Sequence, residues 1–293
     1  MKKLLFLSIL LLPLLAKEPL SFALQHPSRL AYYSLYAQSP HVQKGWSGSM
    51  TLMQTNDYEE ETIYLLDYGL ATLQLDLRYG LDDTSQLRLI APVHYVYGGF
   101  LDGFLDWFHS ATGTLNGNSH NRYGKYKVHI HFAEVSKDSP FFSPGNIQIQ
   151  YKRALGPCAL IFGLKLPTAH KSKSLGTGHP DVAVEITGEK ALNDSTLLWQ
   201  LSVARIGEFR FADFGKSRRW IYEATVEWQY EKWQIQYRFS SSPYRSDYKV
   251  VDSISNVLNI GYALNHKTTL FVSENLPPFY NSPDITFGIR YDF

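Results

Sequence analysis

Apolar and polar residues alternate along many segments of this chain. Successive side chains of a β-strand point to opposite faces, so each such segment has one apolar face and one polar face. The pattern is clearest at the C-terminus, where Ile285, Phe287, Ile289, Tyr291 and Phe293 occupy alternate positions. A soluble β-sandwich could explain one segment, but repetition of the pattern is typical of a membrane-spanning β-barrel. The other alternating segments are 73–79, 87–93, 147–152, 160–166, 182–187, 222–230 and 233–239.

The connections between these segments are alternately short and long. Up-and-down barrels of the outer membrane have short periplasmic turns and longer outer loops. The sequence therefore predicts an all-β fold, an antiparallel up-and-down transmembrane β-barrel of about twelve strands with both ends in the periplasm. The short connections lie near 80–83, 156–157, 192–195, 231–232 and 265–266, and the long ones near 56–61, 98–145, 167–180, 208–219, 242–253 and 277–283.

The N-terminus, residues 1–23, has the features of a secretory signal peptide. Two lysines precede the apolar run Leu4–Ala16, which is shorter than the roughly 20 apolar residues of a transmembrane helix. Cleavage is expected after residue 16 or after residue 23, and a retained anchor is the alternative. Residues 24–293 then form the exported barrel, beginning with an irregular lead.

Composition is consistent with this interpretation. Aromatic residues make up 15% of the chain and include 20 tyrosines, as expected of a barrel with aromatic girdles at both membrane interfaces. The net charge of +1 gives no reason to expect nucleic acid as a partner. A single cysteine, Cys158, excludes an internal disulfide.

The longest connection, 98–145, departs from the strand pattern. Apolar residues recur three and four positions apart within Phe100–His109, which predicts a short amphipathic helix in an outer loop. The segment Tyr126–Val135 looks strand-like and is placed inside this insertion as a hairpin. The helix is expected at the outer rim or in the barrel mouth, where its removal would raise conductance, and ordinary packing on the rim is the alternative. The candidate rim or constriction residues are Phe100, Asp102, Phe104, Asp106, Trp107, His109 and Arg122.

The insertion also contains residue types that bind metal ions. Asp102, Asp106 and His109 are spaced by about one helical turn, while His129 and His131 share one face of the strand-like segment. A solvated polar face explains both groups. No metal, cofactor or catalytic residue is therefore predicted.

Three motifs carry a family resemblance. They are Gly98–His109 (GGFLDGFLDWFH) followed by Asn121-Arg122, then Leu77–Leu81 (LRYGL), then Leu166–Thr168 (LPT) followed by Leu175–Gly178 (LGTG) and Asp181. Together they resemble a family of proteobacterial outer-membrane proteins known as a domain of unknown function. The third is also similar to a motif of barrel proteins linked to transport of aromatic compounds, in which Gly stands where this chain has Ala169. The resemblance implies the barrel fold and the outer membrane, and no activity.

The polar strand faces carry charges of both signs, which are expected to line the lumen. A barrel of about twelve strands lies between those filled by side chains and the open porins. A narrow or occluded lumen laced by charge pairs is therefore predicted. The lumen charges are Asp76, Arg78, Arg88, Glu223, Glu227, Arg238 and Arg290.

These observations favour a narrow channel or a small-solute uptake protein of the outer membrane. The alternatives are a structural or surface-interaction barrel without transport and, less favoured, an outer-membrane lipid hydrolase built on His170, Ser172 and Ser174. The phospholipase pattern His-x-Ser-Asn-Gly is absent from the chain. Expected partners are outer-membrane lipid, a small-molecule solute and the barrel-assembly machinery, which would recognise Tyr291 and Phe293 as a C-terminal signal.

Overall fold

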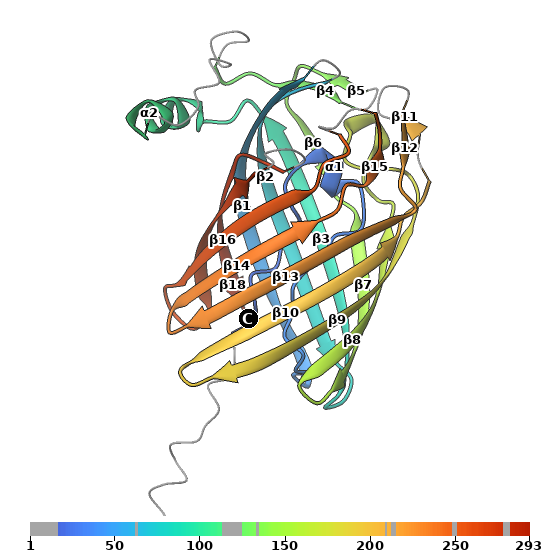
Figure 1. Cartoon of the computed structure of the whole chain (residues 1–293), viewed down its shortest axis with the longest axis vertical. Coiled ribbons are helices and arrows are strands. Elements are labelled where there is room, and N and C mark those ends of the chain that lie inside the picture. Colours follow the sequence, from blue (N-terminus) through green and yellow to red (C-terminus); the bar gives the residue numbers. More distant parts are fainter. Residues whose placement is uncertain are drawn as a thin grey trace, which may run out of the picture.

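The computed structural model describes residues 17–61, 64–112, 125–132, 135–208, 210–211, 215–247, 251–277 and 282–293. Twelve antiparallel strands close into a barrel (Figure 1). They are β1 (Gly45–Glu61), β2 (Tyr64–Gly80), β3 (Ser85–Tyr97), β7 (Ile147–Leu155), β8 (Cys158–Leu166), β9 (Asp181–Leu192), β10 (Ser195–Arg205), β13 (Trp220–Tyr230), β14 (Trp233–Ser240), β16 (Ser255–Ala263), β17 (Thr268–Leu276) and β18 (Ile285–Asp292). Because β1 pairs with both β2 and β18, the barrel is closed, and the predicted fold is confirmed.

Alternation along each strand separates two environments. In β14, Trp233, Ile235 and Tyr237 are exposed on the outer face, whereas Gln234 and Gln236 are buried inside. The outward side chains can contact lipid, and the inward polar ones need partners within the lumen.

Aromatic side chains gather near the ends of the outer face. Trp46 packs on Tyr79 with ring centroids 4.8 Å apart, and Trp233 packs on Tyr262 at the same distance, both at the end that carries the short turns. Tyr95 stacks on Phe142 at 4.3 Å near the opposite end. These two belts are the expected positions of interfacial aromatic residues.

The strand connections follow the predicted alternation with one correction. The tight turns include Leu155-Gly156-Pro157-Cys158, where Gly156 has φ 71°, a left-handed conformation that glycine adopts without a Cβ clash. The predicted long loop at 56–61 is wrong. β1 continues to Glu61 and pairs with β2 up to Tyr64, so this hairpin extends past the barrel wall.

Short elements cover the end of the barrel opposite the short turns, here called the outer end. β4 (His129–Phe132) and β5 (Val135–Lys137) form the hairpin expected in the insertion, and β4 pairs with the extension of β2. β6 (Phe141–Pro144) pairs with the end of β3. The remaining elements are α1 (Pro27–Leu30), α2 (Asp102–Thr112), the 3-10 helix η1 (Lys171–Lys173), and a small sheet of β11 (Arg210–Phe211), β12 (Gly215–Ser217) and β15 (Tyr244–Arg245).

No helix among the described residues has the length and apolar character needed to cross a membrane.

Candidate functional site

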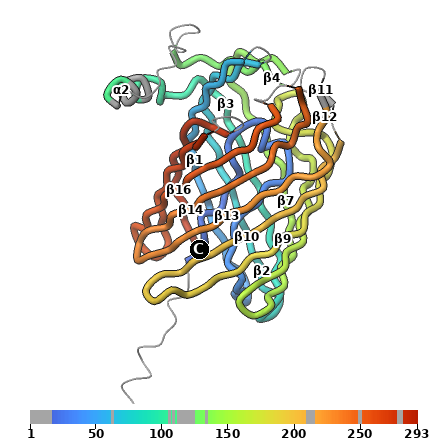
Figure 2. The backbone as a smooth tube through the Cα atoms, viewed as in Figure 1, coloured from blue at the N-terminus to red at the C-terminus, as the bar shows by residue number. Residues whose placement is uncertain are grey.

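The N-terminal segment lies inside the barrel. Residues 17–44, here called the lumen segment, run from the end with short turns toward the outer end, form α1 there, and return to the start of β1 (Figures 1 and 2). Residues 19–40 are buried throughout. The irregular lead predicted from the sequence thus fills the lumen, which the sequence had not indicated.

Wall side chains donate hydrogen bonds to the main-chain carbonyls of the lumen segment. An irregular segment has no neighbouring strand to bond its peptide groups, and buried peptide groups need partners. Lys152 Nζ, for example, donates to the carbonyl oxygens of Ser39 and His41, at 2.9 and 2.7 Å. Other pairs, wall donor first, include Gln234–Glu18 at 3.0 Å, Gln236–Leu20 at 2.8 Å, Gln74–Ser21 at 3.0 Å, Asn146–Leu30 at 2.8 Å, Lys165–Ala31 at 2.9 Å, Arg88–Tyr36 at 2.9 Å, Thr187–Gln38 at 2.8 Å, Arg290–Pro19 at 2.5 Å and Arg238–Phe22 at 2.5 Å.

Wall oxygens accept hydrogen bonds from the segment's main-chain N–H groups. Glu227 Oε2 accepts from the N–H of Leu20 at 2.8 Å, and Asp181 Oδ2 accepts from that of Tyr33 at 2.8 Å. Glu223 accepts from Leu35. The wall therefore bonds both kinds of peptide group along the segment, mostly with carboxylates for its donors and with basic, amide or hydroxyl groups for its acceptors.

The seven predicted lumen charges all lie inside the barrel and are buried. Asp76 accepts from Arg78 at 2.8 Å and from Arg88 at 2.6 Å, forming a three-membered ion cluster on β2 and β3. Arg78 also contacts Glu18 of the lumen segment at 2.7 Å. Glu223 pairs with Arg238 at 2.9 Å. Arg290 pairs with Asp292 at 2.8 Å, and Glu227 accepts from wall glutamines. Each of the seven charges thus has a partner in the wall or in the lumen segment.

The outer half of the lumen segment packs in an apolar cluster. The side chains of this cluster belong to α1 and the residues after it, to the extension of β2, to β4 and to the outer loops. Burial of these side chains closes the outer end with apolar contacts, and a smaller apolar cluster of Leu20, Phe22, Met53 and Phe271 lies elsewhere in the lumen. The cluster includes Leu30, Tyr32, Tyr64, Leu66, Tyr68, Ile130, Phe132, Leu175, Tyr244 and Val251.

Two cavities lie at opposite ends of the barrel. One of about 190 Å³ opens beside the short turns and is lined by Lys17, Glu18, Arg78 and Arg290, among others. The other, of about 620 Å³, lies in the outer loops between Trp220 and Ser242 and is rimmed by charged residues of both signs.

The structure places the predicted rim helix beside the barrel. Figure 1 shows α2 projecting sideways at the outer end, clear of the barrel mouth. Phe104 and Trp107 are exposed, while Asp102 is buried and accepts from the N–H of Tyr126 at 2.7 Å. Phe100 is exposed as well. Arg122 and the side chains of Asp106 and His109 lie outside the described residues.

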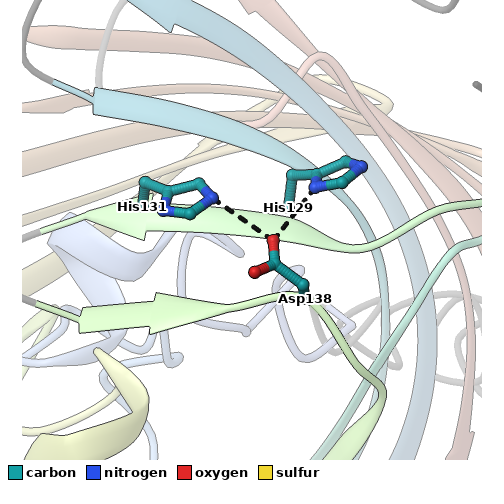
Figure 3. A group of neighbouring side chains, drawn as sticks. All are labelled: His129, His131 and Asp138. Carbon is teal, nitrogen blue, oxygen red and sulfur yellow. Dashed lines mark hydrogen bonds and ion pairs between the residues drawn. The ribbon is translucent and has the colours of Figure 1, made fainter. Parts of the chain in front are cut away.

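The other sequence candidates are placed as follows. His129 Nδ1 and His131 Nε2 lie 3.0 and 3.2 Å from the same oxygen, Oδ1 of Asp138, so the two histidines of β4 flank one carboxylate (Figure 3). His131 Nδ1 lies 2.9 Å from Ser136 Oγ, so hydrogen bonds account for this group. In the loop after β8, Ser174 Oγ donates to the carbonyl of Phe132 at 2.9 Å.

The C-terminal residues complete the barrel seam. Phe293 donates its N–H to the carbonyl of Gly48 at 2.9 Å and accepts from the N–H of Gly48 at 3.1 Å. Tyr291 and the ring of Phe293 are exposed on the outer face. A Cβ on Gly48 would meet that ring at 2.9 Å, so the glycine leaves room for it.

Residues 18–293 match the model of a family described as proteins of unknown function, DUF3187. The chain belongs to this family. No curated protein sequence matches it. The family match begins one residue after the start of the described lumen segment, so it includes nearly all of that segment with the barrel.

Solved structures share the architecture at low sequence identity. An outer-membrane channel from Pseudomonas putida F1 aligns with a TM-score of 0.53 and 12% identity, over 86% of this chain and 96% of that one. The toluene transporter TbuX of Ralstonia pickettii gives 0.40 and 10%, over 86% and 90%. The outer membrane protein Omp33 of Acinetobacter baumannii gives 0.41 and 6%, over 87% and 100%. The first of these supports the fold of an outer-membrane barrel.

Proposed function

We propose that this protein is a channel for small polar solutes in the outer membrane, and that its lumen segment is the closing element. The observation that carries the proposal is the way the segment is held. It belongs to no β-ladder, and its peptide groups are bonded by individual side chains of the wall, such as Lys152, Glu227 and Gln236. Individual side-chain bonds can exchange for water one at a time, whereas a strand added to a sheet leaves only by breaking its whole ladder.

The chemistry of the wall indicates the class of solute. Displacement of the segment would uncover glutamines and paired charges on the inner face, including Gln150, Gln200 and the Asp76 cluster. Such groups can solvate polar molecules. The similar solved structure from Pseudomonas putida F1 is an outer-membrane channel, which agrees with a transport role.

The N-terminus, the outer face and the C-terminus of the chain indicate its location and partners. We infer export through the N-terminal signal peptide, with cleavage after residue 16 rather than after 23. Cleavage after 23 would remove Leu20 and Phe22, which are buried in the lumen. The exposed apolar outer face fits outer-membrane lipid, and the C-terminal Tyr291 and Phe293 fit recognition by the barrel-assembly machinery.

Single-channel recording in planar bilayers tests the proposal. The wild type is expected to open briefly, and a variant lacking residues 18–38 is expected to conduct continuously. A second variant carries Gln38→Cys and Gln150→Cys with Cys158→Ser, because Gln38 Nε2 donates to Gln150 Oε1 at 3.0 Å across the lumen. Joining the two thiols with a short bismaleimide is expected to abolish the openings, and heat-modifiable migration on gels confirms folding in each case.

The structural-barrel alternative predicts a different result. The number of wall contacts to the segment favours permanent occupancy, in which case the wild type would never open. Silence of the folded wild type, with conductance appearing only after deletion, would support that alternative over transport. A non-enzymatic role is proposed in both cases, because Ser174 bonds a main-chain carbonyl and the hydrolase pattern is absent.

A further inference from the structure

A buried group of three metal-binding side chains joins the lumen segment to the barrel wall. His26 precedes α1 in the lumen segment, and Asp57 and Glu59 lie on the inner face of β1 where it extends past β18. The side chains of His26 and Asp57 are fully buried, and that of Glu59 is 7% exposed. The group thus lies between the lumen segment and the barrel wall, which are bonded to each other mainly through side chains.

The distances suit a shared ion better than direct hydrogen bonds. His26 Nε2 lies 3.7 Å from Asp57 Oδ2 and 3.6 Å from Glu59 Oε2, both beyond hydrogen-bond range. The three ligand atoms lie within 4.8 Å of one another. Ligands about 2.0–2.1 Å from a tetrahedral ion are separated by about 3.3–3.4 Å, so small side-chain movements would bring these atoms into place.

Buried atoms without hydrogen bonds in the same group favour binding of a cation. His26 Nε2, Asp57 Oδ1 and Glu59 Oε1 are buried and have no hydrogen-bond partner among the described residues. Buried polar atoms are almost always bonded, and buried charges are paired or bind metal. The unpartnered nitrogen is directed at two carboxylates, and this observation is independent of the acidic residues themselves.

The second nitrogen of the imidazole contacts Ser28, and metal binding at Nε2 requires the tautomer that carries its hydrogen on Nδ1. Nδ1 of His26 lies 2.6 Å from Ser28 Oγ and 3.2 Å from Ser28 N. If Nδ1 carries the hydrogen and donates to Ser28 Oγ, Nε2 presents a lone pair to the carboxylates. If Nδ1 instead accepts from Ser28 N, Nε2 carries a buried hydrogen without an acceptor. A metal-binding histidine usually donates its other N–H in the first manner.

Tyrosines hold the two carboxylates in position. Tyr68 donates to Asp57 Oδ2 at 2.8 Å, and Tyr64 donates to Glu59 Oε2 at 2.6 Å. Both tyrosines lie on β2, the hairpin partner of β1. Carboxylate ligands are themselves usually hydrogen-bonded, so these contacts are what a metal site requires around its ligands.

The local charge also favours a cation. Two further carboxyl groups, those of Asp67 and Asp284, interact with Asp57. Arg29 acts on Glu59, while its guanidinium bonds Ser240 and Ser255. A divalent ion would offset the excess of carboxylates.

We propose that His26, Asp57 and Glu59 form a binding site for a divalent transition-metal ion of the Zn²⁺ class, which fastens the lumen segment to β1. One imidazole and two carboxylates are ligands that Zn²⁺ accepts in tetrahedral sites, with a fourth position for water. The site rests on the geometry of these residues and stands whether or not the barrel conducts.

The test is calorimetric titration of the refolded, EDTA-treated full chain with ZnCl₂. The wild type is expected to bind one ion at this site and to gain thermal stability on binding. His26→Gln is expected to weaken binding at least about tenfold. The control variant His129→Ala/His131→Ala removes the other histidine pair and is expected to retain the binding of the wild type. Co²⁺ provides a spectroscopic readout, because its visible absorption depends on the histidine ligand.

Absence of Zn²⁺ binding by the folded wild type would overturn the site. Unchanged binding by His26→Gln would also overturn it, and loss of binding in the His129/His131 control would then assign the ion to that pair. If His26→Gln fails to fold, Asp57→Asn replaces it, since an amide oxygen can still accept from Tyr68. A barrel whose stability depends on pH but not on Zn²⁺ would show that a proton, rather than a metal ion, serves this cluster.

Discussion

The main-chain N–H of Leu20 donates a 2.8 Å hydrogen bond to Oε2 of Glu227, which lies 207 positions further along the chain. The same carboxylate accepts from Gln229, Gln234 and Gln236, at 2.6 to 3.0 Å. Glu227 therefore organises both the wall of the lumen and the segment inside it. The carboxylate of Glu227 can be buried inside the barrel because four hydrogen-bond donors surround it.

We expect Glu227→Ala to destabilise the folded barrel by about 1–3 kcal/mol, because the buried N–H of Leu20 loses its acceptor. The measurement is the temperature at which heat-modifiable migration is lost. Lys190→Ala, at an exposed position, is the matched control and is expected to change stability by no more than about 0.5 kcal/mol. Equal stability of the two variants would show that the segment is not bonded through Glu227.

The strand register can be tested at two adjacent positions of β14. Ile235 is exposed on the outer face, and Arg within lipid costs up to about 2–4 kcal/mol near the mid-membrane, so Ile235→Arg should impair folding. Gln236 donates to Leu20 and Glu227, so Gln236→Arg is expected to displace the lumen segment as well. In a chain lacking residues 18–38, only Ile235→Arg should remain harmful. The measurement is the refolding yield of each substitution in the full chain and in the shortened chain. Equal yields of the two substitutions in the shortened chain would contradict the register.

The sequence predicted the wall of this barrel and missed its contents. The period of two in Trp233–Phe239 assigns each side chain to lipid or lumen, because a strand leaves only those two choices. The lumen segment has no such period, and many of its contacts join residues more than 100 positions apart, such as Gln38 and Gln150. One signal was present, namely the aromatic and apolar residues of Leu30–Tyr36, which are unusual for an exposed lead.

For the lumen charges, the sequence predicted the direction of the side chains but not their partners. The sequence indicated that Asp76, Arg78 and Arg88 face inward, but it could not show that their partners include Glu18 and the carbonyl of Tyr36. The extension of β1 was missed for a related reason. Asn56–Glu61 is polar, which normally indicates a loop, but here Asp57 and Glu59 face the lumen segment from an intact ladder.

We expect Phe293→Ala to reduce the amount of protein in the outer membrane of cells while leaving the finished barrel nearly as stable as the wild type. The ring is exposed, and the bonds to Gly48 are made by main-chain atoms that alanine retains. Deletion of Phe293 would remove those bonds and lower stability too. Quantifying membrane levels beside thermal stability of refolded protein separates the two effects. Normal membrane levels of Phe293→Ala would argue against an assembly signal.

The histidine pair of β4 gives a prediction on pH. The hydrogen bond from His129 holds the pKa of the Asp138 carboxyl below its ordinary value of 3.8. Because the folded value is lowered, the contribution of this group to hairpin stability is complete above the ordinary pKa and is lost as pH falls through the folded value. NMR titration of the Asp138 carboxyl is expected to give an ordinary pKa in the His129→Ala/His131→Ala variant. An unchanged value there would assign the shift to another cause.

The last prediction concerns α2, which the sequence suggested as a constriction. The helix projects beside the outer end (Figure 1), and its Phe104 and Trp107 are exposed. The lumen is filled instead by residues 17–44, whose carbonyls bond Lys152 and Gln236. Replacing Asp102–Thr112 with a Gly/Ser linker should therefore leave conductance unchanged, while deletion of residues 18–38 raises it. Both variants are recorded in the same bilayer, with heat-modifiable migration as the folding control. A conductance increase in the folded α2 variant would mean that this helix reaches the mouth and restricts passage, as an amphipathic helix at a barrel rim can.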